Sequence, residues 1–154
     1  MPVFYRIVGS QRAATALDGE GARKFGGRWN PAGVAVAYLT ESRALSALEI
    51  LVHFGRDVAK APWTLIEVDV PESLIEEVPL RSLPNGWNDL SSPLVSQKLG
   101  AKWAEKGAAL ALLLPSVIIP EERIAMLNVR HPDLSKIKVS KPVPFFFDPR
   151  LEGK

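Results

Sequence analysis

The first part of the chain alternates between hydrophobic and polar positions in two short segments, and this pattern indicates strands. Residues 3–8, "VFYRIV", are rich in β-branched and aromatic side chains and end at the turn-forming Gly9 and Ser10. Residues 34–39, "VAVAYL", place Val and Tyr on one face and Ala and Leu on the other, which suits a closely packed strand. Between the two strands, residues 11–33 are rich in Gly, Ala, Arg and Asn and are predicted to form a long loop.

Two helices are marked by signals at their ends. The helix after the second strand has Thr40 or Ser42 as a possible N-cap, and Gly55 is a plausible stop. A later segment, "SPLVSQKLGAKWAEKG", offers Ser92 as a cap and Pro93 at the first helical position. Both segments therefore predict helices of ordinary length.

One carboxylate breaks the apolar pattern of the first helix. Leu45, Leu48 and Val52 follow the helical spacing i, i+3 and i+7, and Glu49 occupies the missing i+4 position. Ionised carboxylates are almost never fully buried without a partner. Glu49 is therefore predicted to face a polar pocket or to be paired.

The second half of the chain adds more strands than helices. Residues 63–70, "WTLIEVDV", read as a strand, and residues 122–129 and 136–147 give two further strand candidates around a buried run at 108–114. Strands and helices alternate irregularly, without a glycine-rich phosphate turn. The predicted class is therefore α+β, with a mixed β-core and flanking helices.

Composition favours a single domain, 1–154, because 47% hydrophobic residues in 154 are enough to build one core. There are no cysteines, so neither disulfides nor thiolate metal sites are available, and a cytoplasmic location is expected. The opening residues lack the pattern of a secretory signal. The longest apolar run is interrupted at Pro115 and is too short to span a bilayer, so no membrane insertion is expected.

Charge and histidine content narrow the possible ligands. The 19 basic and 17 acidic residues give a net charge of only +2, so the overall field for nucleic acid is weak. His53 and His131 lie far apart without an accompanying carboxylate pattern, and no metal site is expected. Any anion binding is therefore expected to be local.

Two arginines and a serine stand out beside Glu49. Arg6 lies in an apolar strand, where an outward-facing position is favoured over a functional one. Arg28 follows two glycines and offers a planar fork suited to phosphate, although a solvated loop arginine is equally expected. Either arginine could pair with Glu49. Ser116 follows Pro115 between two apolar runs and could cap a turn, the commoner role, or bind a ligand; no surrounding motif makes it a nucleophile.

The loop "RKFGGRW" mixes cations with aromatic rings. Such a mixture binds phosphates and stacks bases, so it suits single-stranded RNA or a nucleotide cofactor. Because its basic residues are local and are not spread over a face, the small ligand is preferred. RNA binding stays open as an alternative.

The chain resembles the RES domain family, whose name records an arginine, a glutamate and a serine. The resemblance rests on "YRI", on "GGRWNPAG", "AYLTES" and "ALEILVH" in the middle, and on "LLLPSVIIPEERIAMLNVRHPD" toward the end. It covers nearly the whole chain. It implies a compact fold related to ADP-ribosyltransferases, a mixed β-core around an NAD cleft, and NAD as the molecule consumed without a metal.

The resemblance also implies roles for individual residues. Glu49 would accept a hydrogen bond from the sugar and stabilise positive charge at the ribose, Arg6 and Arg28 would hold the diphosphate, and Tyr38 would stack on nicotinamide. A second stacking face would come from Tyr5 or Trp29. The residues implied as catalytic are Glu49, Arg28 and Ser116, and those implied as cofactor-binding are Arg6, Arg28, Tyr38, Ser116 and Asn128.

The implied function is that of a toxin in a toxin–antitoxin pair that cleaves the nicotinamide–ribose bond of NAD, by hydrolysis or phosphorolysis, and stops growth. The alternative within the same site is transfer of ADP-ribose to a protein acceptor. The implied partner is a cognate helix-turn-helix antitoxin that blocks the active site, without direct binding of the toxin to nucleic acid.

Overall fold

One mixed sheet runs through the protein in the strand order β4-β5-β6-β2-β1-β3-β7, and β8 pairs with β3. The computed structural model describes residues 2–152. The strands are β1 (Val3–Gly9), β2 (Val36–Thr40), β3 (Trp63–Asp69), β4 (Ile75–Glu77), β5 (Ala111–Pro115), β6 (Arg123–Asn128), β7 (Lys138–Val139) and β8 (Val143–Phe145). β4 and β5 are parallel, and the other pairs are antiparallel. The predicted α+β class is confirmed.

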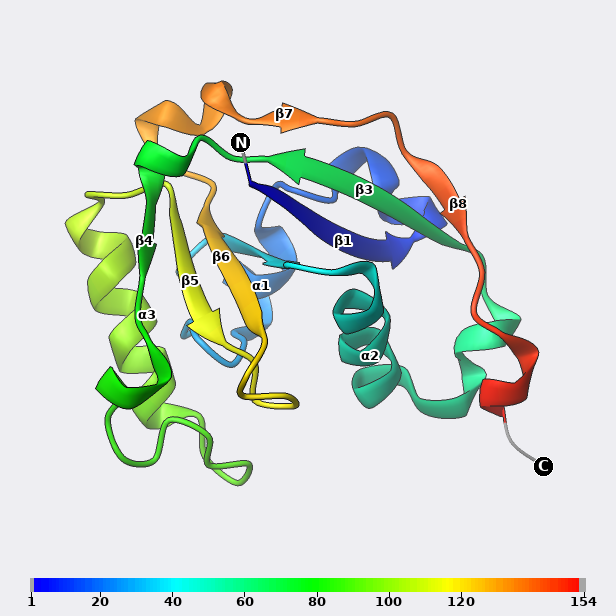
Figure 1. The fold of residues 1–154 in the computed structure, drawn as a ribbon, viewed down its shortest axis with the longest axis horizontal. Helices are drawn as coiled ribbons and strands as arrows, with labels where there is room; N and C mark the ends of the chain where they lie inside the picture. Colours follow the sequence, from blue (N-terminus) through cyan, green and yellow to red (C-terminus); the bar gives the residue numbers. More distant parts are fainter. Residues whose placement is uncertain (1, 153–154) are drawn as a thin grey trace.

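Three α-helices and several 3₁₀ segments cover the sheet. The helices are α1 (Glu20–Phe25), α2 (Arg43–Phe54) and α3 (Leu94–Lys106), and the 3₁₀ segments are η1 (Ser10–Thr15), η2 (Gly55–Lys60), η3 (Glu72–Leu74), η4 (Leu80–Ser82), η5 (Pro132–Lys136) and η6 (Pro149–Glu152). In Figure 1 the sheet curls: β4, β5 and β6 run steeply on one side, β1 and β3 run across the other, and α2 lies below their junction. Within residues 2–152, no helix has the length and apolar character needed to cross a bilayer.

The two faces of the sheet carry separate parts of the core. On one face, Phe4, Val8, Leu39, Val68 and Leu127 belong to a single buried cluster that spans β1, β2, β3 and β6. The opposite face carries one cluster under β2, β5 and β6, in which α3 contributes Trp103 and α2 contributes Leu45, and another under β1 and β3. Because both faces are covered, burial alone does not show which side of a strand points inward.

The predicted first helix is confirmed, together with its ends. The hydroxyl of Ser42, and not that of Thr40, accepts a hydrogen bond from the Leu45 N–H at 3.0 Å, and the helix ends at Gly55 with φ 66°. α3 is also confirmed, but Pro93 occupies its N-cap position and no side chain caps it, so the prediction of a Ser92 cap was wrong.

The long loop predicted at 11–33 contains two helical segments, so that prediction was wrong in part. η1 follows β1, and α1 is a six-residue helix bracketed by Gly19 (φ 72°) and Gly26 (φ 74°). A helix this short gives little periodicity to detect. The candidate strand at 136–147 is two short strands, and the three-residue β4 has no counterpart in the sequence prediction.

Candidate active site

Glu49 and Ser116 form a hydrogen-bonded pair across 67 positions of sequence. Ser116 directly follows the last residue of β5 and is 1% exposed, and its Oγ donates to Oε1 of Glu49 at 3.2 Å. The Oγ of Ser116 also accepts hydrogen bonds from the backbone N–H groups of Ile118 and Ile119, at 3.1 and 3.2 Å. A hydroxyl has one proton and two lone pairs, so the hydrogen-bonding capacity of Ser116 is fully used.

α2 sets the position of Glu49. Its Ala47, Ile50 and Leu51 pack in the apolar cluster under β1 and β3, while Leu45 is buried under β5 and β6. Val52 is 60% exposed, so the stripe that carries Glu49 leaves the core along its length. The glutamate therefore lies at the edge of the buried surface, which explains a carboxylate in this pattern.

Burial raises the pKa of Glu49 above 4.5, and the hydrogen bond from Ser116 and the charge of His53 act in the opposite direction. None of the basic side chains of residues 2–152 lies within salt-bridge distance of this carboxylate. The alternative of a salt bridge with Arg6 or Arg28 is therefore not realised, and the partner of Glu49 is Ser116. Glu49 is a carboxylate held by a neutral donor.

Arg6 points inward, so the outward-facing interpretation favoured by strand alternation is wrong. It shares a face of β1 with the buried Phe4 and Val8, and its Nη1 donates to the backbone oxygen of Tyr38 at 2.9 Å. Its Nε is buried without a hydrogen-bond partner among residues 2–152. Burial lowers the pKa of Arg6, and the charge of Asp18 opposes that shift.

Tyr38 is tied to the loop that precedes β2. Its hydroxyl donates to Oδ1 of Asn30 and accepts from the backbone N–H of Trp29 at 3.1 Å. Burial raises the pKa of Tyr38, so the phenol stays protonated. Gly27 is needed here because a Cβ at this position would lie 2.9 Å from the tyrosine ring and hydroxyl. The double glycine thus allows the loop to close on Tyr38.

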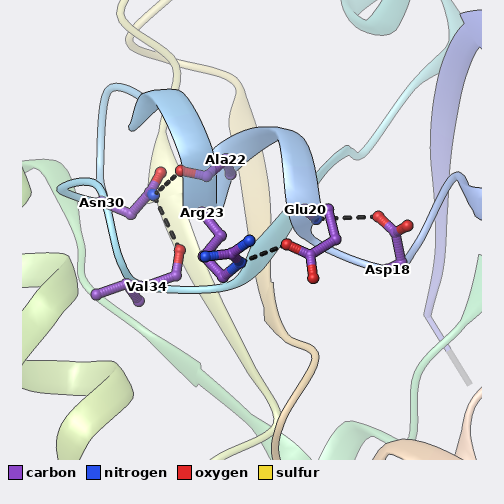
Figure 2. A network of polar contacts seen from close by, with 6 residues as sticks. All are labelled: Asp18, Glu20, Ala22, Arg23, Asn30 and Val34. Atoms are coloured by element: carbon purple, nitrogen blue, oxygen red, sulfur yellow. Dashed lines mark hydrogen bonds and ion pairs between the residues drawn. The ribbon is translucent and has the colours of Figure 1, made fainter.

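Asn30 is a site-building residue that the sequence analysis missed. It is fully buried, and its amide donates to the backbone oxygens of Ala22 at 2.9 Å and Val34 at 3.1 Å. Figure 2 shows this amide joining α1 to the segment before β2, beside the ion pair of Arg23 with Glu20. The available signal was the Asn-Pro pair in "NPAG", which often starts a turn.

The loop arginine and its neighbouring tryptophan have different surroundings. Arg28 is half-buried, and its Nη1 donates to the backbone oxygen of Asp89 at 2.8 Å. Trp29 is fully buried and stacks on Trp87 with ring centroids 5.8 Å apart. The prediction that Trp29 offers a stacking face is therefore wrong, and the RNA-binding alternative loses one of its two aromatic rings. Tyr5 is covered by the guanidinium of Arg43 at 4.5 Å.

Asn128 lies apart from the Glu49–Ser116 pair. Ser116 pairs with Glu122 ahead of β6, whereas Asn128 ends that strand six residues later, about 20 Å away along an extended chain. Its amide contacts the backbone oxygen of Ala104 at 3.4 Å and the N–H of Arg130 at 3.1 Å, beside a cavity of about 460 Å³. These contacts join β6 to α3.

Comparison with known proteins places this chain in a family. The RES domain family model matches residues 3–148. The chain belongs to the RES domain family. A relative from Sphingobium sp. (strain YBL2), named "Prs ADP-ribosylating toxin", is 38% identical over 98% of this chain and 97% of its own length. A "Toxin Res" from Yersinia enterocolitica is 34% identical over 97% and 99% of the two chains.

A solved structure shares the fold of this RES domain. The toxin–antitoxin complex MbcT–MbcA of M. tuberculosis contains a chain that matches with a TM-score of 0.79 over 97% of this chain and 86% of that one, at 21% identity. At that level of identity the match concerns the fold. It agrees with the curled mixed sheet and flanking helices described above.

Proposed function

We propose that this protein is the toxin of a toxin–antitoxin pair and consumes NAD by cleaving its nicotinamide–ribose bond. The observation that carries the proposal is the carboxylate of Glu49, half-buried at the edge of the core and held by the hydroxyl of Ser116. Membership of the RES domain family and the similarity to relatives named as toxins support the same proposal.

Cleavage of the nicotinamide–ribose bond is accelerated by negative charge beside the ribose. Breaking the bond to nicotinamide builds positive charge on the ribose, and contacts to the sugar 2-hydroxyl strengthen as it develops. A fixed carboxylate with few solvent contacts stabilises such a charge better than a solvated one. Nicotinamide is already cationic in NAD and leaves as a neutral molecule, so no strong general acid is required. Glu49 takes the role of the electrostatic stabiliser.

Arg6 and Arg28 would bind the diphosphate, and Tyr38 would stack on nicotinamide. The buried Nε of Arg6 is a donor without a partner in the described chain, which fits an anion that is brought by the ligand. Arg28 is half-exposed and keeps donors beyond the one given to Asp89. The guanidinium of Arg6 donates to the backbone oxygen of Tyr38, and Arg28 directly precedes Trp29, whose backbone N–H donates to the Tyr38 hydroxyl.

Ser116 acts on Glu49 and does not bind the ligand in this proposal. Its only proton is donated to the carboxylate, and its oxygen is held by two backbone N–H groups. It therefore orients Oε1 and leaves Oε2 of Glu49 for the ribose. Asn128 contributes to the fold of the β6–α3 corner, and a direct contact with NAD stays a prediction.

The acceptor of the ADP-ribose group defines the second candidate function. A relative that is 38% identical carries the name "Prs ADP-ribosylating toxin", which favours transfer to a protein as the alternative. Labelled NAD incubated with a cell lysate tests it: a labelled protein band that disappears with Glu49→Gln indicates transfer. Label that is found only in small molecules indicates hydrolysis or phosphorolysis.

The proposal includes a cytoplasmic location and an antitoxin that blocks the NAD site. The fold match to a chain from a toxin–antitoxin complex is consistent with such a partner. A helix-turn-helix protein encoded beside this chain is the expected antitoxin. Its addition at equal molarity should stop NAD turnover, and unchanged turnover in a stable complex would show that it binds elsewhere.

The deciding experiment is nicotinamide release from NAD by the purified protein, with and without phosphate. Release in both buffers indicates a hydrolase, and release only with phosphate indicates a phosphorylase. No release in either buffer, combined with no labelled protein in the lysate, would overturn the proposed function. Glu49→Gln serves as the inactive control in each case.

A further inference from the structure

The stripe of α2 side chains that includes Glu49 is buried at the start of the helix and exposed at its end. Toward the start of α2, Leu45 is 1% exposed and Ser46 is 5% exposed, and Ser116 covers one carboxylate oxygen. Toward the end of the helix, Val52 is 60% exposed and His53 is exposed as well. The helix face that carries Glu49 is therefore open to solvent at the end at which His53 lies.

His53 is the titratable neighbour of Glu49 on this open side. Residues four apart on a helix lie on the same face, about 5–6 Å apart between Cβ atoms. Glu49 and His53 are four residues apart within α2, so their side chains lie on neighbouring turns of the same helix face. The other group that acts on Glu49 through its side chain is Ser116, whose proton is already donated.

We propose that His53 is a second catalytic residue, whose imidazole removes the proton from an acceptor hydroxyl that enters beside Glu49. The inference rests on the proposed function, because it concerns the same bond cleavage. The bond between C1′ and the nicotinamide nitrogen breaks, and its electron pair leaves with neutral nicotinamide. The acceptor oxygen forms the new bond to C1′, and its proton moves to the imidazole, which becomes cationic.

This role makes a prediction about which acceptors depend on His53. Water, or a hydroxyl group of a protein, has to lose a proton as it attacks, so a general base accelerates the step. Azide carries no proton and attacks as an anion, so it needs no base. A residue that only stabilises the end of α2, where a cation is favoured by the helix dipole, would not distinguish the two acceptors.

The test compares His53→Gln with the matched control Val52→Ala, an exposed neighbour without proton chemistry. Nicotinamide release from NAD is measured in phosphate-free buffer with water alone and again with added azide, and ADP-ribosyl azide is quantified as the product. For His53→Gln we expect water-dependent turnover to fall about 100-fold or more, while azide-dependent turnover stays within about twofold of wild type. Imidazole added to His53→Ala should restore part of the water reaction.

Several outcomes would overturn the inference. Unchanged water-dependent turnover in His53→Gln overturns it alone, because the wild-type protein still cleaves NAD. An equal loss with water and with azide also overturns it, since His53 would then affect bond cleavage or folding; the melting temperature separates these two. Release by the wild-type protein only with phosphate overturns the inference alone, because water is then not an acceptor. Absence of nicotinamide release with water, azide or phosphate, combined with no labelled protein in the lysate, overturns the proposed function together with this inference.

Discussion

Replacing Glu49 by Gln should separate the stability of this protein from its activity. The substitution keeps the size of the side chain and an oxygen that can still accept the Ser116 hydrogen bond, so the fold is retained. It removes a negative charge that burial disfavours and that no basic group of residues 2–152 neutralises at salt-bridge distance. Activity and stability are therefore expected to change in opposite directions.

The expected loss of activity has a defined scale. Removing one fixed electrostatic stabiliser costs about 100- to 1,000-fold in kcat, or about 2.7–4 kcal/mol of transition-state stabilisation. Because the proposed role of Glu49 is to stabilise the charge that develops during cleavage, kcat should fall with little change in the KM for NAD. Nicotinamide release over a range of NAD concentrations measures both. Full activity in the variant, or a raised KM with unchanged kcat, would refute the role given to Glu49.

The expected gain in stability depends on pH, and its sign follows from the raised pKa of Glu49. The folded wild-type protein binds this proton more tightly than the unfolded chain, so its stability falls as pH rises above the ordinary value of 4.5. Glu49→Gln should therefore melt slightly higher than wild type at pH 7, and the difference should vanish at low pH. For about 1 kcal/mol the rise is about 2–4 °C.

Glu41→Gln is a suitable control, because Glu41 forms an ion pair with an arginine and, within the described residues, Glu49 does not. Glu41 accepts hydrogen bonds from the guanidinium and the backbone N–H of Arg123 at 3.1 and 2.9 Å. Its neutralisation should lower or leave unchanged the melting temperature and should leave NAD turnover near the wild-type rate. A higher melting temperature for Glu41→Gln, matching that of Glu49→Gln, would show that the gain comes from reduced net charge and not from burial.

Three further substitutions test other parts of the structure. Ser116→Ala removes the hydrogen bond that lowers the pKa of Glu49, so the acid limb of the kcat profile should move to higher pH with an unchanged KM; a raised KM would indicate ligand binding by the serine. Arg28→Ala should raise the KM for NAD about tenfold or more, since a hydrogen bond to a charged group contributes about 1.5–3 kcal/mol, and an unchanged KM would contradict phosphate binding. Gly100→Ala should destabilise the protein by about 2 kcal/mol and lower the melting temperature by about 4–8 °C, because the new Cβ would lie 1.6 Å from the Trp29 carbonyl oxygen. Without this close contact, Gly→Ala would stabilise a helix. An unchanged melting curve would refute the close packing.

Local signals were sufficient for the first helix and for its unusual carboxylate. Ser42, Gly55 and the apolar spacing lie within one stretch of chain, and each acts over a few residues. The same spacing showed that Glu49 interrupts an apolar stripe. What it could not show is that the stripe leaves the core at Val52, because that depends on where the sheet ends above α2.

The partners of the candidate site residues could not be predicted, because they come from distant parts of the chain. Ser116 and Glu49 are 67 positions apart, and Trp29 is buried by Trp87 from a loop that no periodic pattern describes. The prediction of the orientation of Arg6 failed for a different reason. Alternation of hydrophobic and polar residues shows which side chains share a face of a strand. It shows which face is buried only when the other face is exposed to solvent, and here both faces of β1 are covered.

The place where β1 meets β2 brings the side chain of Arg6 to the backbone of Tyr38. The two strands pair at Tyr5 and Thr40, and the backbone carbonyl oxygen of Tyr38 accepts a hydrogen bond from the side chain of Arg6. The Tyr38 carbonyl oxygen thus holds Arg6 at Nη1, while its Nε has no hydrogen-bond partner in the described chain. A half-buried cation held at one nitrogen and unsatisfied at another is suited to an anionic ligand, which supports the proposal that Arg6 binds the diphosphate of NAD.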